Sequence, residues 1–460
     1  MERSNGPAAE SGSTTRIGGL MRRVVDVRKG EETVLLLSFS YFMLVLFSYY
    51  IIRPIRDVMG TESGIENLAW LFTGTLVAML VAQPMFGGLV KKLPRRRFIA
   101  VAYRFFAINL LLFFLLMRWL PAGSEIWVGR VFYIWTAVFN LFVVSVFWAL
   151  MADVFARDQG KRLFGLIAVG GTVGAIAGSL VTAVLSRVVD PVSLLLVSAV
   201  LLEFAVWCTF AIQRTKLTRD DAETTIASPD VPPERAIGGS VWAGLTHVMR
   251  SPYLLGIVGF MLLFTILSTF LYYHQVDIAD RYFADRGART SFFSSVDLAV
   301  NVLTLLTQLF LTGRIMKYLG VSVALAFLPV MSVLGFAALA VSPTIFVLVA
   351  FYVIRRAGNF AIARPSREVL FTIIPREDKY KAKSFIDTAV YRAGDQVGAW
   401  SYTGLSVGLG LTMGGIAVVA IPLAVTWAAI AIWLGRRQAK MAGDQAASAR
   451  AAARPAVATQ

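Results

Sequence analysis

Residues 98–119, FIAVAYRFFAINLLLFFLLMRW, decide the class of fold. Their only charged members are Arg104 and Arg118, and about 20 predominantly apolar residues let a helix cross about 30 Å of hydrocarbon. A strand of a membrane β-barrel would instead alternate apolar and polar residues over about ten positions. The run 110–116 does not alternate. This stretch therefore predicts a transmembrane helix.

The whole chain shares this apolar character. Of its 460 residues, 57% are hydrophobic and 16% are charged, and the mean hydropathy is +0.68, whereas soluble domains are roughly half apolar and a quarter charged. Cys208 is the only cysteine, which excludes a disulfide-rich secreted scaffold. The basic residues interrupt apolar runs that are too long for a globular core, so we expect no binding to nucleic acid. The composition predicts an all-α integral membrane protein.

Charge clusters and Pro/Gly turns divide the chain into twelve apolar segments, each long enough for one transmembrane helix. They are residues 33–52, 66–90, 98–119, 126–151, 163–187, 192–213, 252–275, 290–312, 320–341, 343–363, 384–408 and 412–434.

The loops between these segments predict the orientation in the membrane. The formal net charge is +16, from 44 Lys and Arg against 28 Asp and Glu. Every second loop is basic, as at residues 91–97 and 376–383, while the loop at 408–410 has no charge. Cytoplasmic loops carry the excess of Lys and Arg. We therefore expect a multi-pass protein embedded in the lipid bilayer, with both termini in the cytoplasm.

A polar stretch divides the chain into two halves of six helices each. The expected organisation is a cytoplasmic tail at 1–30, a first half at 31–213, a linker at 214–250, a second half at 251–435 and a tail at 436–460. A shift of 220 residues lays Asp158 on Asp378, Lys161 on Lys381, Gly174 on Gly394 and Gly178 on Gly398. Two six-helix halves are the architecture of major facilitator transporters, whose substrate site lies near the midplane between the halves.

Glycines recur every fourth residue in the fifth segment, at Gly170, Gly174 and Gly178. This spacing is typical of close helix packing in membranes rather than of a phosphate-binding loop. The chain has no Gly-x-x-x-x-Gly-Lys-[Ser/Thr] motif, no cluster of residues at metal-ligand spacing and no nucleophile with an adjacent base. We therefore expect no ATP hydrolysis, no enzymatic activity, no cofactor and no metal.

Ionisable residues inside the spans are the candidates for function, because each costs at least about 2.5–3.5 kcal/mol to insert. Arg53 and Arg56 share a face at the end of the first span, and Asp57 could pair with Arg53 from the i+4 position. Arg355 and Arg356 are adjacent, so they must point in different directions. An ordinary helix end with snorkelling arginines explains the first cluster equally well.

Arginines outnumber carboxylates among these residues, and guanidinium groups bind phosphate or carboxylate through paired hydrogen bonds. The surplus predicts a small anionic solute as the ligand. The alternative is that arginines and aspartates pair across the two halves as gates.

Three short blocks resemble the ATP/ADP translocase family, the nucleotide exchangers of intracellular bacteria and plastids. They are residues 49–57, YYIIRPIRD; residues 379–387, KYKAKSFID, with Arg392 and Gly394; and Phe147-Trp148. The resemblance implies a major-facilitator-like fold, exchange of phosphorylated solutes and a place in the bacterial inner (plasma) membrane. It also implies roles in nucleotide transport for Arg56 and for a lysine of the Lys381/Lys383 block.

Two positions depart from that family pattern. Asn140 is the polar residue of the fourth span, where the exchangers carry an acidic residue, and Asp395 stands where they usually carry a lysine. One lost cation and one added anion predict weaker binding of a polyphosphate.

The resulting hypothesis is a monomeric secondary transporter that exchanges nucleotides, or related anionic phosphorylated solutes, by alternating access. A proton-coupled permease for another organic anion or solute is the second reading, and a membrane scaffold or sensor without cargo is the third. The residues expected to bind substrate are Arg53, Arg56, Arg104, Asn140, Arg356, Lys381, Lys383 and Arg392. Those expected to couple or gate transport are Asp57, Asp297, Asn301, Asp387 and Asp395.

Overall fold

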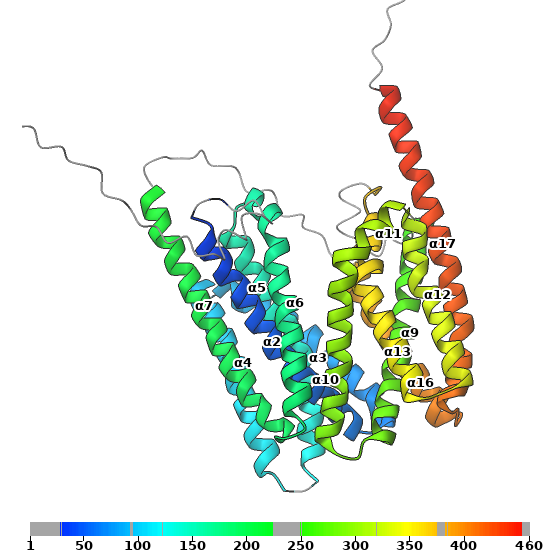
Figure 1. The fold of residues 1–460 in the computed structure, drawn as a ribbon, viewed down its shortest axis with the longest axis horizontal. Coiled ribbons are helices and arrows are strands. Elements are labelled where there is room, and N and C mark those ends of the chain that lie inside the picture. The colour runs from blue at the N-terminus through cyan, green and yellow to red at the C-terminus, as the bar shows by residue number, and fades with distance from the viewer. Residues whose placement is uncertain are drawn as a thin grey trace, which may run out of the picture.

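The computed structural model describes residues 28, 30–92, 95–121, 123–223, 249, 251–318, 320–374, 382–383 and 385–452. All the long elements in these ranges are helices, and they form two groups that stand side by side (Figure 1).

The first group holds six membrane-length helices, which are shown from blue to green in Figure 1. They are α2 (Glu32–Glu62), α3 (Ile65–Lys92), α4 (Arg95–Trp119), α5 (Glu125–Val154), α6 (Arg157–Leu185) and α7 (Leu194–Glu223), the last preceded by the short turn η1 (Pro191–Ser193).

The second group repeats this arrangement, but several of its crossings are interrupted by π-helical segments. Its elements are α9 (Pro252–Tyr282); α10 (Arg286–Thr307) with η2 (Gln308–Thr312) and α11 (Gly313–Tyr318); α12 (Gly320–Val341); α13 (Ile345–Gly358) with η3 (Asn359–Ala363) and α14 (Arg364–Leu370); η4 (Ile386–Val390) with α16 (Tyr391–Thr403) and η5 (Gly404–Gly408); and α17 (Met413–Ala452).

Side-chain caps mark where several helices of this group begin. Asp285 accepts a hydrogen bond from the Ala288 amide at 2.9 Å, and the hydroxyl of Thr344 accepts one from the Val347 amide at 3.4 Å. Such caps satisfy amide groups that have no partner inside the helix. The starts of α10 and α13 are therefore fixed by local sequence.

Eleven helical segments in the described part of the chain are long and apolar enough to cross a membrane. The remaining expected span, 384–408, is the stretch formed by η4, α16 and η5, and it contains Arg392, Asp395 and Gln396. Its polarity has a structural reason, because α16 packs between the halves against α9 and α3. The twelve crossings in two six-helix halves are thus present, and one of them is polar.

Several helices run beyond the expected boundaries, among them α2, which continues to Glu62 rather than ending at 52, and α9, which continues to Tyr282 rather than ending at 275. α7 continues to Glu223 rather than ending at 213, and α17 continues to Ala452 rather than ending at 434. Hydropathy detects only the part of a helix that lies in hydrocarbon, so polar extensions escape it. Most of the expected tail at 1–30 and linker at 214–250, namely residues 1–27, 29, 224–248 and 250, lies outside the described residues.

The glycine repeat packs α6 directly against α2, as its spacing predicts. A Cβ atom added to Gly174 would lie 2.1 Å from the carbonyl oxygen of Met43, and one added to Gly178 would lie 2.6 Å from that of Phe47. In the second half, a Cβ atom on Gly394 would lie 1.8 Å from the hydroxyl of Thr265 on α9. Glycines that the shift of 220 residues lays on each other therefore make the same kind of contact in both halves, between the first and the fifth of six helices.

The two ends of the bundle are named here from α2. The Glu31 end is where α2 begins, and the Glu62 end is where it ends. Because successive crossings run in opposite directions, α14 ends and α16 is entered at the Glu31 end, while α10 begins at the Glu62 end. The halves meet mainly where α10 contacts α2 and α6, and where α16 contacts α3.

Candidate functional site

Two neighbouring cavities lie between the halves. The central cavity has a volume of about 450 Å³, and the second, of about 770 Å³, extends toward Arg364, Glu368 and Lys383 at the Glu31 end. The two share part of their lining, so they form one continuous path. The shared residues are Arg53, Asn140, Ser268, Arg356, Phe360, Tyr391 and Arg392.

Cations dominate the charged lining of this path. Eight cationic side chains line it, Arg53, Arg56, Arg355, Arg356, Arg364, Arg367, Lys383 and Arg392, against three carboxylates, Glu368, Asp387 and Asp395. Adding Asp57 and Asp297, which bind lining arginines from behind, still leaves more cations than anions. A cavity with fixed surplus positive charge and low-dielectric walls favours an anionic ligand.

Asp297 on α10 joins the two halves through Arg53. Its Oδ1 atom lies 3.0 Å from Nη1 of Arg53 on α2 and 2.6 Å from Nη1 of Arg356 on α13. The Asp297 side chain is only 4% exposed, and its Oδ2 atom has no hydrogen-bond partner among the described residues. The helical spacing suggested Asp57 as the partner of Arg53, but the partner is Asp297, from the other half.

Asp57 instead pairs with Arg56, at 3.4 Å between Oδ1 and Nη1, and accepts a hydrogen bond from the hydroxyl of Tyr272 at 3.0 Å. The guanidinium of Arg56 lies 4.1 Å from the ring centre of Tyr133, a distance typical of a cation–π contact. Tyr133 and Tyr272 share a hydrogen bond of 3.2 Å between α5 and α9. Arg56 thus lies against aromatic rings from both halves, Tyr133 from the first and Tyr272 from the second.

The two adjacent arginines on α13 point in different directions, as expected. Arg356 faces Asp297 and the cavity, whereas Arg355 is 5% exposed and donates to the hydroxyls of Ser332 at 2.9 Å and Ser268 at 3.0 Å. No carboxylate among the described residues pairs with Arg355. The π-helical segment η3 begins at Asn359, three residues after Arg356, and such segments often occur at functional sites.

Four further expected residues line the path, namely Lys383, Asp387, Arg392 and Asp395. Arg392 pairs with Asp395 at 3.3 Å, and Asp387 lies 3.5 Å from Arg367. Lys383 pairs with Glu368. The remaining expected cation of this region, Lys381, lies outside the described residues.

The expectation that Arg104 reaches the cavity is wrong. Arg104 on α4 forms a two-pronged ion pair with Glu203 on α7, with Nη2 and Nε at 2.6 and 3.1 Å from Oε1. Both side chains are about half exposed on the outer side of the first half, and neither lines a cavity. Each neutralises the other, so the pair has no need of a ligand.

Asn140 lines both cavities, in agreement with its expected place. Asn301 lies behind the cavity wall, where its side-chain oxygen accepts a hydrogen bond from Tyr50 at 3.2 Å and its amide donates to Ser179 at 3.4 Å. It therefore links α10 to both α2 and α6.

Aromatic residues complete the lining, and most of them could not be selected from the sequence. Those of the central cavity are Tyr49, Tyr50, Phe72, Tyr133, Tyr272, Phe360 and Tyr391. Local signals were confined to Tyr49-Tyr50, a few residues before Arg53, and to Tyr391, directly before Arg392. Rings beside guanidinium groups can hold a flat, partly apolar group next to an anionic one.

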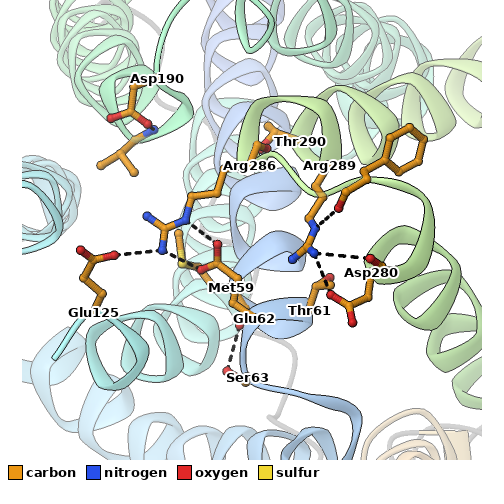
Figure 2. Close-up of polar contacts among 12 residues, drawn as sticks. Met59, Thr61, Glu62, Ser63, Glu125, Asp190, Asp280, Arg286, Arg289 and Thr290 are labelled. Carbon is orange, nitrogen blue, oxygen red and sulfur yellow. Dashed lines mark hydrogen bonds and ion pairs between the residues drawn. The ribbon is translucent and has the colours of Figure 1, made fainter. Parts of the chain in front are cut away.

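A charged cluster closes the Glu62 end (Figure 2). Arg286 at the start of α10 binds Glu62 at the end of α2, and its Nη2 atom lies 3.1 Å from Oε2 of Glu125 at the start of α5. Arg286 belongs to the second half and both glutamates to the first. None of these three residues was among those selected from the sequence.

The hydrogen bonds and ion pairs seen between the halves in the described part of the chain lie between the level of Asn301, one turn beyond Asp297 on α10, and the Glu62 end. Besides those above, Thr73 on α3 donates to Gln396 on α16 at 2.9 Å, and Arg187 donates to Ser291 at 2.9 Å. The cavity is therefore sealed toward the Glu62 end, while its wider part extends toward the Glu31 end.

At the Glu31 end, Glu31 ties the start of α2 to α6 within the first half. Its carboxylate accepts hydrogen bonds from Gln159 at 2.9 Å and Arg162 at 3.1 Å. Burial acts to raise the pKa of Glu31, but these bonds and one from the Arg28 amide outweigh burial and lower the pKa below that of an ordinary glutamate.

The comparison with known families agrees with this architecture. A model of the Major Facilitator Superfamily matches residues 37–391. This chain belongs to the Major Facilitator Superfamily. Among curated proteins, this superfamily member is similar to ADP,ATP carrier protein 2 of Chlamydia pneumoniae, with 22% identity over 92% of each chain. It is also similar to ADP,ATP carrier protein 1 of Chlamydia trachomatis serovar D, with 22% identity over 91% of this chain and 90% of the relative.

Solved structures show the same major facilitator fold. One is a bacterial homologue of the human lysosomal transporter Spinster, inward-facing and unoccupied, with a TM-score of 0.57 and 12% identity. Another is the nucleoside transporter NupG, with a TM-score of 0.55 and 16% identity. Each alignment covers 90% of this chain and 99% of the other. The protein is a membrane transporter, a divergent relative of the ADP,ATP carriers.

Proposed function

We propose that this transporter exchanges nucleotides, or related phosphorylated anions, by alternating access. The observation that carries the proposal is the path between the halves, where eight cationic side chains face three carboxylates. Guanidinium groups bind phosphoryl oxygens through paired, charge-assisted hydrogen bonds.

The neighbouring rings favour a nucleotide over a simple anion. Tyr133 and Tyr272 surround the guanidinium of Arg56, and Tyr391 adjoins Arg392. A nucleotide combines a flat base with a phosphate chain, so it matches a lining of rings beside cations. The likeness to ADP,ATP carriers over nine-tenths of the chain supports the same class of substrate.

The direction of opening follows from the loops. The basic loops lie at the Glu31 end, and basic loops are cytoplasmic. We therefore infer that the Glu31 end and both termini face the cytoplasm, and that the structure is an inward-facing conformation of a bacterial inner-membrane transporter. In the opposite conformation, the contacts at the Glu62 end separate and the Glu31 end closes.

A proton-coupled permease is the second candidate, and one observation favours it. Asp297 is buried within the membrane-spanning region with one oxygen unpartnered, and intramembrane carboxylates often carry protons in transporters. In this alternative Asp297 or Asp395 takes up a proton during each cycle.

Binding of radiolabelled ADP to purified protein tests the proposed substrate class. The expected result is saturable binding that Arg56→Gln and Arg392→Gln each abolish, because each removes a cation from the cavity lining. Arg104→Gln is the matched control, since it removes an arginine whose side chain lies outside the cavities, and it should bind ADP like the wild type. Equal binding by all four proteins would reject the site, and no binding by the wild type would reject the nucleotide.

A further inference from the structure

Arg53 and Arg356 come from different halves and converge on a single oxygen atom, Oδ1 of Asp297, at 3.0 and 2.6 Å. Two guanidinium groups so close together repel each other unless an anion lies between them. Asp297 supplies that anion here. The arrangement has the form of an anion-binding site whose occupant is part of the protein.

The arginines and the carboxylate differ in their access to the cavity. Both arginines line both cavities, whereas Asp297 lines neither and is 4% exposed. A solute in the cavity therefore reaches the guanidinium groups from one side while Asp297 holds them from the other. An ion pair with a purely structural role has no need to present its cations to the cavity.

Asp297 also uses the two arginines incompletely. It engages both through Oδ1 alone, while its Oδ2 atom is buried without a hydrogen-bond partner in the described residues. A guanidinium group offers five N–H donors in a planar fork. A phosphoryl group, with three terminal oxygens, can satisfy more of these donors than one carboxylate oxygen does.

We propose that Arg53 and Arg356 form a subsite for one oxyanion group of the substrate, a phosphoryl group in particular, and that Asp297 is its built-in competitor. When an anion binds from the cavity, it displaces Asp297 from the arginines. The substrate then takes over the bridge between α2 and α13, and the Arg53–Asp297 bridge between α2 and α10 is released. This inference rests on the proposed function only in that an anion must enter the cavity.

The displacement has a consequence for exchange. Opening of the Glu62 end requires the Arg53–Asp297 bridge to separate. Breaking a buried ion pair without a replacement leaves an uncompensated charge, which is strongly unfavourable. An anion on the two arginines removes that penalty, so the bridge separates readily only in the loaded transporter.

Binding of inorganic phosphate to the purified full-length chain tests the competition, measured as the phosphate dependence of the unfolding temperature with chloride as the reference salt. Asp297→Asn removes the competing charge at similar size and should lower the apparent Kd for phosphate about tenfold or more. That factor corresponds to a wild type in which Asp297 holds the arginines in nine-tenths of the molecules. Adding Arg356→Gln to Asp297→Asn should remove the gain.

Asn301→Ala is the matched control. It lies one turn from Asp297 on α10 and breaks a different contact with α2, the hydrogen bond from Tyr50, so it weakens the same interface without freeing the arginines. Its apparent Kd for phosphate should equal that of the wild type. If Asp297→Asn yields no folded protein, Asp297→Ser tests the same loss of charge with a smaller side chain.

The outcomes separate this proposal from the proposed function. Unchanged or weaker phosphate binding in the folded Asp297 variant overturns the competition, as does an equal gain in Asn301→Ala. Labelled ADP is titrated in parallel. A gain for phosphate without any binding of ADP supports the subsite and rejects the nucleotide, whereas ADP exchange without a gain for phosphate does the reverse.

Discussion

Replacing Arg286 with glutamine should open the Glu62 end of the transporter. Arg286 is the residue through which the second half binds both Glu62 and Glu125 of the first (Figure 2). Glutamine keeps hydrogen-bonding groups but removes the charge. In the proposed opposite conformation the Glu62 end is open and this cluster is separated, so its loss should shift the equilibrium in one direction.

The magnitude follows from the exposure of the three side chains. Arg286 and Glu125 are each 36% exposed and Glu62 is 19% exposed. Exposed ion pairs contribute roughly 0.2–1 kcal/mol each, and partial burial places these two pairs near the upper limit. Together they stabilise the closed end by about 1–2 kcal/mol. Since about 1.4 kcal/mol is a factor of ten, the open population should rise roughly 5- to 30-fold.

The assay is the distance between two spin labels across the Glu62 end, measured by pulsed electron paramagnetic resonance. Cys208 is the only native cysteine, so Cys208→Ser gives a clean background. Labels attached through Ile126→Cys on α5 and Ala284→Cys before α10 are exposed and lie on opposite halves. Arg286→Gln should increase the fraction of long distances.

Arg289→Gln provides the control. Arg289 lies three residues further along α10, but its partners are Asp280 at 2.8 Å and the Phe283 carbonyl, both within the second half. This variant should leave the distances unchanged. If Arg286→Gln also leaves them unchanged, or if both variants shift them equally, the cluster is not a lock between the halves.

Three further predictions concern packing, the Arg104–Glu203 pair and pH. Gly174→Leu should destabilise the protein by about 1–3 kcal/mol or more, seen as a lower unfolding temperature, because a Cβ atom there would meet a backbone carbonyl oxygen at 2.1 Å; Gly165→Ala, with nothing within 4 Å, should not. Arg104→Leu should leave the affinity for anions unchanged in equilibrium binding. A loss of affinity would show that Arg104 contributes to the binding site. Because the pKa of Glu31 is lowered, the stability that this carboxylate contributes is fully present above the ordinary glutamate pKa and is lost as pH falls from there through the lowered value. Thermal unfolding followed from about pH 6 down to about pH 3 should therefore show a steeper loss for the wild type than for Glu31→Gln.

Hydropathy and small-residue spacing were sufficient to predict much of this fold. A membrane helix makes its backbone hydrogen bonds within itself and is apolar over about 20 residues, so runs such as 98–119 can be recognised from the sequence. The spacing of Gly170 and Gly174 likewise predicted contact with another helix, because only small residues let backbones approach so closely.

The rotation of each helix could not be predicted in the same way. Lipid and protein interior are both apolar, so a membrane helix that is apolar on every side carries little signal of which face is inward. Arg104 shows the consequence, because its depth in the membrane suggested a site while its face points away from the cavity. The same holds for Arg355 and Arg356. The sequence could show only that their side chains point in different directions, not which of them faces the cavity.

Partners distant in the sequence were equally hidden. The i,i+4 spacing suggested that Arg53 pairs with Asp57, yet its partner is Asp297 on α10. Local spacing reports only contacts within one helix, whereas this ion pair depends on how the two halves dock. The cluster of Arg286, Glu62 and Glu125 is a second case, because its members lie in three separate helices.

Transport by the purified protein in liposomes tests the central claim most directly. Labelled ADP is added outside liposomes that contain unlabelled ATP, unlabelled ADP or buffer alone, with and without a proton gradient. The account predicts saturable uptake that requires a nucleotide inside and is unaffected when the proton gradient is collapsed. Uptake into liposomes that contain only buffer, driven by the proton gradient, or no uptake of ADP under any condition, would contradict it.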